Sequence, residues 1–145
     1  MLPMLVLGKD HMRGTIHLVA TAAFIQAAVA WAGPAGIPTP LHSKWCEGIG
    51  NPTPDMQITG CTEAILSGEF LGNKLALAYR NRGIAYGNKR EYDSAISDLD
   101  QAILLNPGDA LAFYNRGIAK QKNGYTAAGN TDIAQAKRLQ PSIKQ

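Results

Sequence analysis

The residues of this chain that are best suited to chemistry are one histidine and two cysteines that lie close together in the sequence. His42, Cys46 and Cys61 are the only histidine and cysteines that follow residue 32. They supply too few ligands for a zinc site, at a spacing that matches no familiar zinc motif. A cysteine nucleophile needs a base, and His42 is the sole histidine available. A thiol or metal enzyme built on these residues is therefore the least favoured function.

Other catalytic patterns are absent from the sequence. The carboxylate pairs Glu91/Asp93 and Asp98/Asp100 are spaced two positions apart, which places their members on different faces of a helix. The chain has no phosphate-binding loop, no dinucleotide glycine motif and no run of metal ligands. We therefore expect no enzyme, no cofactor and no metal site. The 14 basic and 11 acidic residues form no basic stripe, so we also expect no nucleic-acid partner.

The N-terminal part of the chain has the composition of an export signal. Residues 14–34 contain no charged side chain, and small residues end the apolar stretch. This predicts a signal peptide over 1–32, cleaved after Ala32 or, as second choice, after Ala30. A retained membrane anchor is the alternative, although the stretch is short for a span of about 20 apolar residues. Met1 and Met12 both fit as the start. We expect an exported protein, periplasmic or secreted, without membrane contact once the signal is removed.

Export changes what the two cysteines are expected to do. In an oxidising compartment an even number of cysteines favours a bridge, here between Cys46 and Cys61. Such a bridge closes a loop of about 15 residues, which stabilises a fold by about 3 kcal/mol. Free structural thiols, or a reactive thiol or metal ligand, are the alternatives.

The segment between the signal and the first strong helix pattern is rich in proline and glycine. Residues 33–54 hold five prolines and four glycines, which predicts irregular chain. Thr53 then provides an N-cap and Pro54 suits a first helical position, so we expect a helix over 55–67. The domain itself is expected to cover 55–145.

A 34-residue repeat occupies the C-terminal part of the chain. Residues 76–109 and 110–143 agree at Asn81/Asn115, Arg82/Arg116, Gly83/Gly117, Ile84/Ile118, Ala85/Ala119, Asp98/Asp132, Ala102/Ala136, Leu105/Leu139 and Pro107/Pro141. The apolar spacing predicts two helices in the first unit, over 74–88 and 92–105. Asp109 is expected to cap the helix that follows.

Two kinds of repeated residue predict how the helices pack. Glycine inside a helix costs about 1 kcal/mol relative to alanine, so Gly83 and Gly117 are expected where helices cross too closely for a side chain. The repeated acids Asp98 and Asp132 are expected to pair with a groove or loop arginine, for instance Arg82 or Arg116, in a structural contact and not as functional acids.

The first unit carries the residue pattern of a known family. The matching residues are Tyr79, Gly83, Tyr86, Ala95, Leu99, Ala102 and Pro107. This pattern resembles the tetratricopeptide repeat, of the short exported bacterial type. The second unit keeps Phe113, Gly117, Ile133, Ala136 and Pro141, but it has Lys120 where a tyrosine is expected and Gly129 where an alanine is expected.

The resemblance implies an all-α, helix-turn-helix solenoid of about two and a half repeats. The helix over 55–67 would be the lone second helix of a truncated unit that precedes 76–109 and 110–143. About three units are usually needed for such an array, and the disulfide is expected to offset the missing half. The polar outer face of 130–140 would cap the array or, as the alternative, pair two copies of the chain.

The resemblance also places function on a surface. In this family the first helix of each unit lines a concave groove, where an asparagine commonly binds the backbone of a peptide. The groove residues implied for this chain are Asn81, Asn115, Arg80, Ile84, Tyr114, Ile118 and Lys122. The alternative is that both asparagines only bind neighbouring helices, since buried amides usually find internal partners.

The expected function is a non-catalytic protein–protein interaction module with a protein or peptide partner. The alternative is a structural homodimer, or a small subunit that stabilises an envelope complex. The mass of the protein in solution distinguishes the two, because a dimer at all concentrations favours the alternative.

Overall fold

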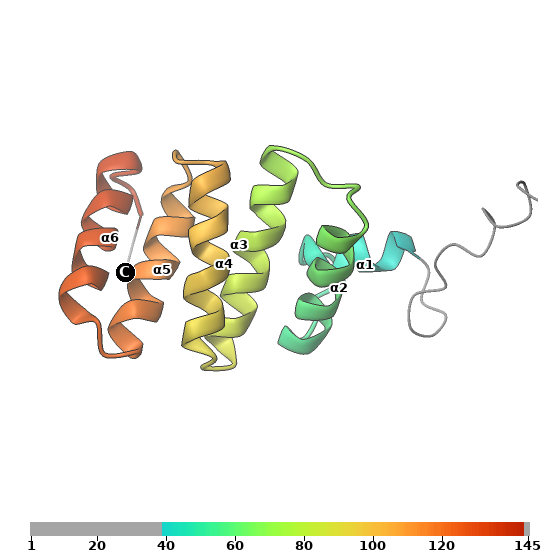
Figure 1. Ribbon diagram of the computed structural model, residues 1–145, viewed down its shortest axis with the longest axis horizontal. Coiled ribbons are helices and arrows are strands. Elements are labelled where there is room, and N and C mark those ends of the chain that lie inside the picture. Colours follow the sequence, from blue (N-terminus) through green and yellow to red (C-terminus); the bar gives the residue numbers. More distant parts are fainter. Residues whose placement is uncertain (1–38, 144–145) are drawn as a thin grey trace, which may run out of the picture. The chain divides into compact units, whose positions relative to one another are not determined.

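The computed structural model describes residues 39–143, and every regular element in this range is an α-helix. The helices are α1 (Thr39–Cys46), α2 (Pro54–Leu66), α3 (Asn73–Asn88), α4 (Tyr92–Leu105), α5 (Ala110–Lys122) and α6 (Thr126–Leu139) (Figure 1). Within this range no helix combines the length and apolar character needed to cross a membrane. The predicted signal peptide, 1–32, lies outside the described residues.

The helices form three successive pairs that stack side by side (Figure 1). α1 packs on α2, α3 on α4 and α5 on α6, while α2–α3 and α4–α5 contacts join one pair to the next. This is the predicted all-α helical solenoid. The loops after α2 and α4 and the end of α6 lie at one edge of the stack, and the loops within the pairs lie at the other.

The N-terminal end of the stack corrects two expectations. The sequence predicts irregular chain over 33–54, but α1 forms at Thr39–Cys46 inside that range. Pro40 is the second residue of α1, in the first turn, where a backbone donor would have no helical partner in any case. Nor is α2 a lone helix, because α1 packs against it as the first helix of a short pair.

Local signals place the helix ends close to their predicted positions. Thr53 caps α2 by accepting a hydrogen bond from a first-turn backbone N–H at 3.3 Å, and Pro54 begins the helix. Asp109 caps α5 in the same way, at 3.1 Å. α3 and α4 begin and end within one residue of the predicted 74–88 and 92–105.

The glycines inside helices lie at the predicted close crossings. A Cβ atom on Gly83 would lie 2.9 Å from Leu99 Cγ, and one on Gly117 would lie 2.7 Å from Ile133 Cγ1. The crossing of α5 and α6 leaves no room for a side chain on either helix, because a Cβ on Gly129 of α6 would also lie only 2.6 Å from the Gly117 carbonyl oxygen. This contact explains why Gly129 stands where the first unit has an alanine.

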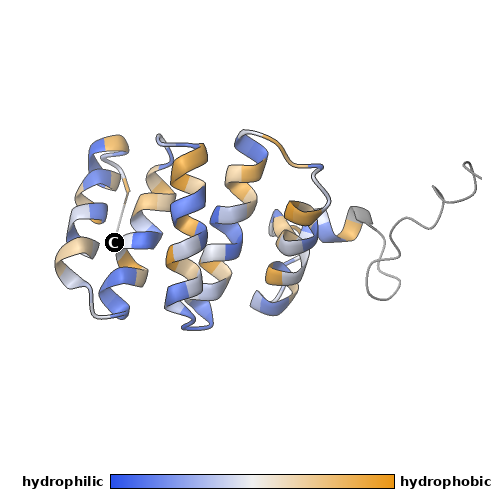
Figure 2. Cartoon of the chain, viewed as in Figure 1, coloured by the Kyte–Doolittle hydropathy of each residue, from blue (hydrophilic) through white to orange (hydrophobic). Residues whose placement is uncertain are grey.

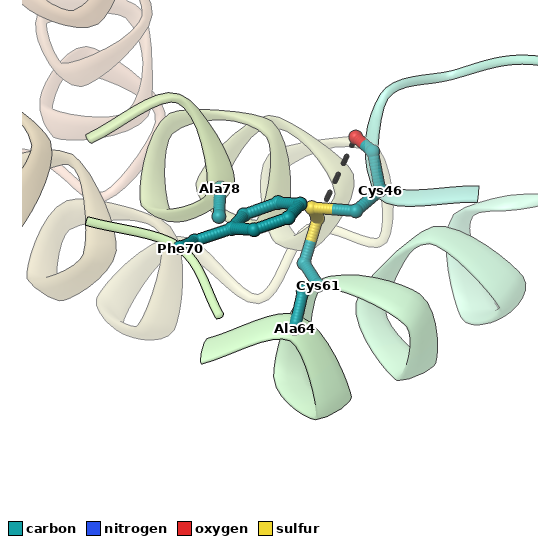
Figure 3. Packing of buried hydrophobic residues seen from close by; sticks show 5 residues of the cluster. All are labelled: Cys46, Cys61, Ala64, Phe70 and Ala78. Carbon is teal, nitrogen blue, oxygen red and sulfur yellow. Dashed lines mark hydrogen bonds between the residues drawn. A yellow bond between two sulfur atoms is a disulfide. The ribbon is translucent and has the colours of Figure 1, made fainter. Parts of the chain in front are cut away.

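A disulfide between Cys46 and Cys61 joins α1 to α2. Both cysteines are fully buried, and Ala64, Phe70 and Ala78 pack around them (Figure 3). Phe70 comes from the loop between α2 and α3, and Ala78 from α3 itself. The disulfide is therefore the centre of a small core that connects the first helix pair to the second.

Candidate functional site: the surface between α3 and α5

Buried ion pairs join the two helices of each repeat. Arg82 of α3 donates two hydrogen bonds to Asp98 of α4, from Nε to Oδ2 at 2.7 Å and from Nη2 to Oδ1 at 2.9 Å. Arg116 of α5 binds Asp132 of α6 in the same way, at 2.8 and 2.6 Å. The expectation that each repeated acid pairs with an arginine is confirmed. Asp98 and Asp132, the two buried acids of the repeats, are therefore both engaged in structural contacts.

Each arginine also reaches back to the preceding helix pair. Arg82 Nη1 donates to Thr62 Oγ1 at 3.0 Å, and Arg116 Nη1 donates to Asp100 Oδ1 at 2.6 Å. Thr62 of α2 therefore accepts a hydrogen bond from Arg82 in the same way that Asp100 of α4 accepts one from Arg116. α2 is therefore placed as the second helix of a preceding repeat would be.

These contacts shift the pKa values of the paired groups. The hydrogen bond with Asp98 raises the pKa of Arg82 by more than burial lowers it. At Asp132 burial is the largest influence and acts to raise the pKa, but hydrogen bonds from Arg116 and Lys120 together bring the pKa below its ordinary value. Asp132 is thus held ionised, which does not suit a general acid near neutral pH.

Lys120, which replaces an expected tyrosine, has a structural partner. Its Nζ lies 2.9 Å from Asp132 Oδ2. The departure from the family pattern at this position therefore adds a second cation to a buried acid instead of removing a contact.

The two repeated asparagines have different partners. Asn81 Nδ2 donates to the carbonyl oxygen of Cys46, the last residue of α1, at 2.8 Å. Asn115 Nδ2 donates to the carbonyl oxygen of Leu111, one turn earlier in its own helix, at 2.7 Å. Asn81 therefore binds a neighbouring helix, whereas the amide of Asn115 stays within α5.

A cavity of about 160 Å³ lies beside Asn115, between α3, the start of α4 and α5. We call it the α3–α5 cavity. Four of the predicted groove residues line it, namely Ile84, Asn115, Ile118 and Lys122. Asn88, Tyr92 and Leu99 are also in its wall. Lys122 is the only charged residue that lines it, and it forms no ion pair within the described range.

The other predicted groove residues do not line this cavity. Arg80 Nη1 donates to Asp109 Oδ2 at 3.0 Å and so holds the residue that caps α5. The Nε of Arg80 is buried and has no hydrogen-bond partner in residues 39–143. Tyr114 is half-buried and lies outside the cavity wall, as does Asn81.

Asn88 and Tyr92 are among the seven lining residues that are not in the set of groove residues predicted from the sequence. Asn88 continues the line of Asn81 and Ile84 along α3, so helical spacing was sufficient to find it. Tyr92 lies in the apolar stripe of α4, where the sequence pattern indicates only core packing. Its place in the cavity wall follows from how α4 crosses α3, which spacing along one helix does not reveal.

The comparison with known families decides the identity of the fold. Residues 76–109, which cover most of α3 and all of α4, match the family model of the tetratricopeptide repeat. Residues 76–109 are a tetratricopeptide repeat. A comparison with curated proteins gives no match. Tetratricopeptide repeats are protein–protein interaction modules and typically carry no catalysis. Residues 39–143 contain no group of three or more His, Cys, Asp or Glu side chains that could hold a metal ion.

Proposed function

We propose that this protein binds an extended segment of a partner protein at the α3–α5 cavity, in an exported compartment. The binding is non-catalytic, and the segment lies along α3 and α5. Asn115 is its hydrogen-bonding anchor, and Ile84 and Ile118 are its apolar contacts.

The observation that carries this proposal is the contact between Asn81 and Cys46. There the repeated asparagine holds a main-chain carbonyl oxygen, at 2.8 Å, and that carbonyl belongs to the end of α1. Asn115, 34 residues later, has no such carbonyl from α3 and borders an open cavity instead. A carbonyl of a bound segment would take the place beside Asn115 that the Cys46 carbonyl has beside Asn81.

The size of the cavity favours a peptide over a small molecule. Pockets for small ligands are usually about 300–1,000 Å³, whereas the α3–α5 cavity is about 160 Å³. That volume suits one side chain of a longer segment. The lining offers apolar side chains, two asparagine amides and Lys122, so an apolar side chain with an acidic neighbour complements it.

The disulfide supports the exported location. Disulfides persist in oxidising compartments and are rare in the cytosol. Cys46 and Cys61 are bonded at the centre of a packed cluster, and the sequence predicts an export signal over 1–32.

The test is site-specific photo-crosslinking in cells that export the protein. A crosslinking residue at Ile118 should capture a partner that the same residue at Ser94, exposed on α4, does not capture. Asn115→Ala should weaken binding of the purified partner roughly tenfold, the loss expected for one hydrogen bond at a desolvated site.

Asn81→Ala is the matched control. It removes the same amide 34 residues earlier, where the amide already binds Cys46, so it should lower stability and leave affinity unchanged. Equal capture at Ile118 and Ser94, or equal affinity for Asn115→Ala and the unaltered protein, would move the binding surface away from this cavity.

A further inference from the structure

Six exposed leucines gather at one edge of the helix stack. This edge consists of the loops that follow α2 and α4, the first turn of α5 and the end of α6, and we call it the leucine edge. Its leucines are Leu66, Leu71, Leu104, Leu105, Leu111 and Leu139. Figure 2 shows apolar colour on this side, at the end of α4 and in the loop between α2 and α3. The opposite edge carries charged residues in its loops, with Lys89, Arg90 and Glu91 between α3 and α4.

The exposure of these leucines is large. Leu71 is 74% exposed, Leu104 73% and Leu66 62%. Single exposed leucines are normal, but six along one edge uncover several hundred Å² of apolar surface, which marks an interaction surface. A specific interface buries roughly 800 Å² on each partner. The leucines therefore supply a large part of the area that a stable contact needs.

Charged side chains flank the leucines at both ends of the leucine edge. Glu69 lies between Leu66 and Leu71, at the α2 end, and Lys74 in the first turn of α3 is exposed at the same end. Arg138 adjoins Leu139 at the α6 end, and it stands 34 positions after Leu104 in the repeat. Between the two ends, the carboxylate of Asp109 is paired with Arg80 at 3.0 Å. The edge is thus apolar in the middle, with charges of both signs at the α2 end and Arg138 at the α6 end.

We propose that the leucine edge is the contact surface between two copies of this chain, related by a two-fold axis. An axis that passes beside Leu104 places the α2 end of one copy against the α6 end of the other. Glu69 then faces Arg138 of the second copy, twice in each dimer, and the leucines of the two edges cover one another. The leucines of the edge thus match their own reverse, and Glu69 gains a partner of opposite charge in Arg138, as a two-fold contact requires.

Stacking of copies end to end is less favourable. α3 and α4 pack Tyr86 and Ile96 against the core that they share with α5. At the equivalent positions 34 residues later, α5 and α6 have Lys120 and Asn130. The free end of the last pair is therefore more polar than the face by which the preceding pair packs on its neighbour. This independent feature favours the leucine edge over the end of the stack as the surface that a second copy covers.

The first test measures mass in solution by sedimentation equilibrium over a wide range of concentration. The unaltered protein should have the mass of a dimer. Leu104→Glu places two carboxylates beside the axis and should raise the dissociation constant roughly 100-fold. Tyr125→Glu is the matched control, because Tyr125 is 60% exposed at the opposite edge. It should leave the dimer intact, and circular dichroism should show unchanged helix content in both variants.

The second test exchanges the charges. Glu69→Arg should weaken the dimer roughly tenfold by facing Arg138 with a like charge, and adding Arg138→Glu should restore it. A monomer at every concentration, or a dimer that Leu104→Glu leaves intact, overturns the proposal. The first of these results would leave the leucine edge to a different protein or to a membrane. A dimer that the charge exchange fails to restore overturns the two-fold arrangement.

Discussion

Arg116 binds Asp132 through two parallel hydrogen bonds, from Nη2 to Oδ1 at 2.6 Å and from Nε to Oδ2 at 2.8 Å. The carboxylate side chain is 8% exposed, so an unpaired charge there would be costly. Arg116→Ala should therefore lower the free energy of unfolding by about 3 kcal/mol, the lower part of the range for breaking a buried pair, because Lys120 still neutralises part of the charge. Urea denaturation measures this loss.

The control for this substitution is a second acid that contacts the same arginine. Asp100 contacts Arg116 Nη1 at 2.6 Å, but its side chain is half exposed. Asp100→Ala should cost less than about 1 kcal/mol, because water screens an exposed pair. Equal losses for Arg116→Ala and Asp100→Ala would contradict a dominant role for the buried pair.

The Asp132 contacts also predict how stability depends on pH. The folded protein lowers the pKa of Asp132 from its ordinary value, by hydrogen bonds from Arg116 and Lys120 that outweigh burial. A lowered pKa means that this carboxylate stabilises the fold at and above its unfolded pKa of about 3.9. The contribution is lost as pH falls through the folded pKa. Below about pH 4, Asp132→Asn should therefore lose stability less steeply than the unaltered protein.

Urea unfolding of Asp132→Asn and of the unaltered protein, from acid to neutral pH, measures this difference. The same acid slope in Asp132→Asn and in the unaltered protein would show that this pair does not set the pH dependence.

The helix-crossing glycines predict opposite effects of one substitution at two positions of α3. A methyl group on Gly83 would lie 2.9 Å from Leu99 Cγ and 3.1 Å from the Ala95 carbonyl oxygen. Gly83→Ala should therefore destabilise the fold by about 1–3 kcal/mol, as overpacking does. A methyl group on Gly87 would meet no atom of a neighbouring helix within 4 Å, so Gly87→Ala should stabilise the fold by up to about 1 kcal/mol. Thermal unfolding of the two variants shows whether the two substitutions change stability in opposite directions.

The disulfide should be a large single contribution to the stability of the first helix pair. Cys46 and Cys61 are 15 positions apart, and closing such a loop stabilises a fold by about 3 kcal/mol in the chain-entropy account. Reduction under denaturing conditions, followed by refolding in reductant, should lower the urea midpoint. A Cys46→Ala/Cys61→Ala double variant should have the same lower midpoint with or without reductant. A midpoint that reductant does not change in the unaltered protein would contradict this role.

The repeat made much of the helical architecture predictable. Residues such as Gly83 and Gly117, or Arg82 and Arg116, recur at one period because each pair of helices solves the same packing problem. The predicted partners of the arginines, Asp98 and Asp132, are the partners that the structure shows. The helix caps at Thr53 and Asp109 were also predictable from the sequence, because a cap depends on residues within one turn of it.

The N-terminal segment was not predictable in this way. Its prolines and glycines indicate irregular chain, yet α1 forms there because Cys46 is bonded to Cys61 and packs with Phe70 in the core beside α3. A helix of eight residues is marginal on its own and gains its stability from tertiary packing. No local pattern in the segment contains that information.

The sequence by itself determined which surfaces repeat, because periodic spacing sets the face of a helix on which each side chain lies. Only the tertiary structure decided that the two equivalent asparagines differ. Asn81 meets the carbonyl at the end of α1, while Asn115 faces a helix that continues past it to Asn88 and leaves a cavity instead. The physical reason is that a hydrogen bond depends on where the neighbouring helix ends, which the residues around each asparagine do not encode.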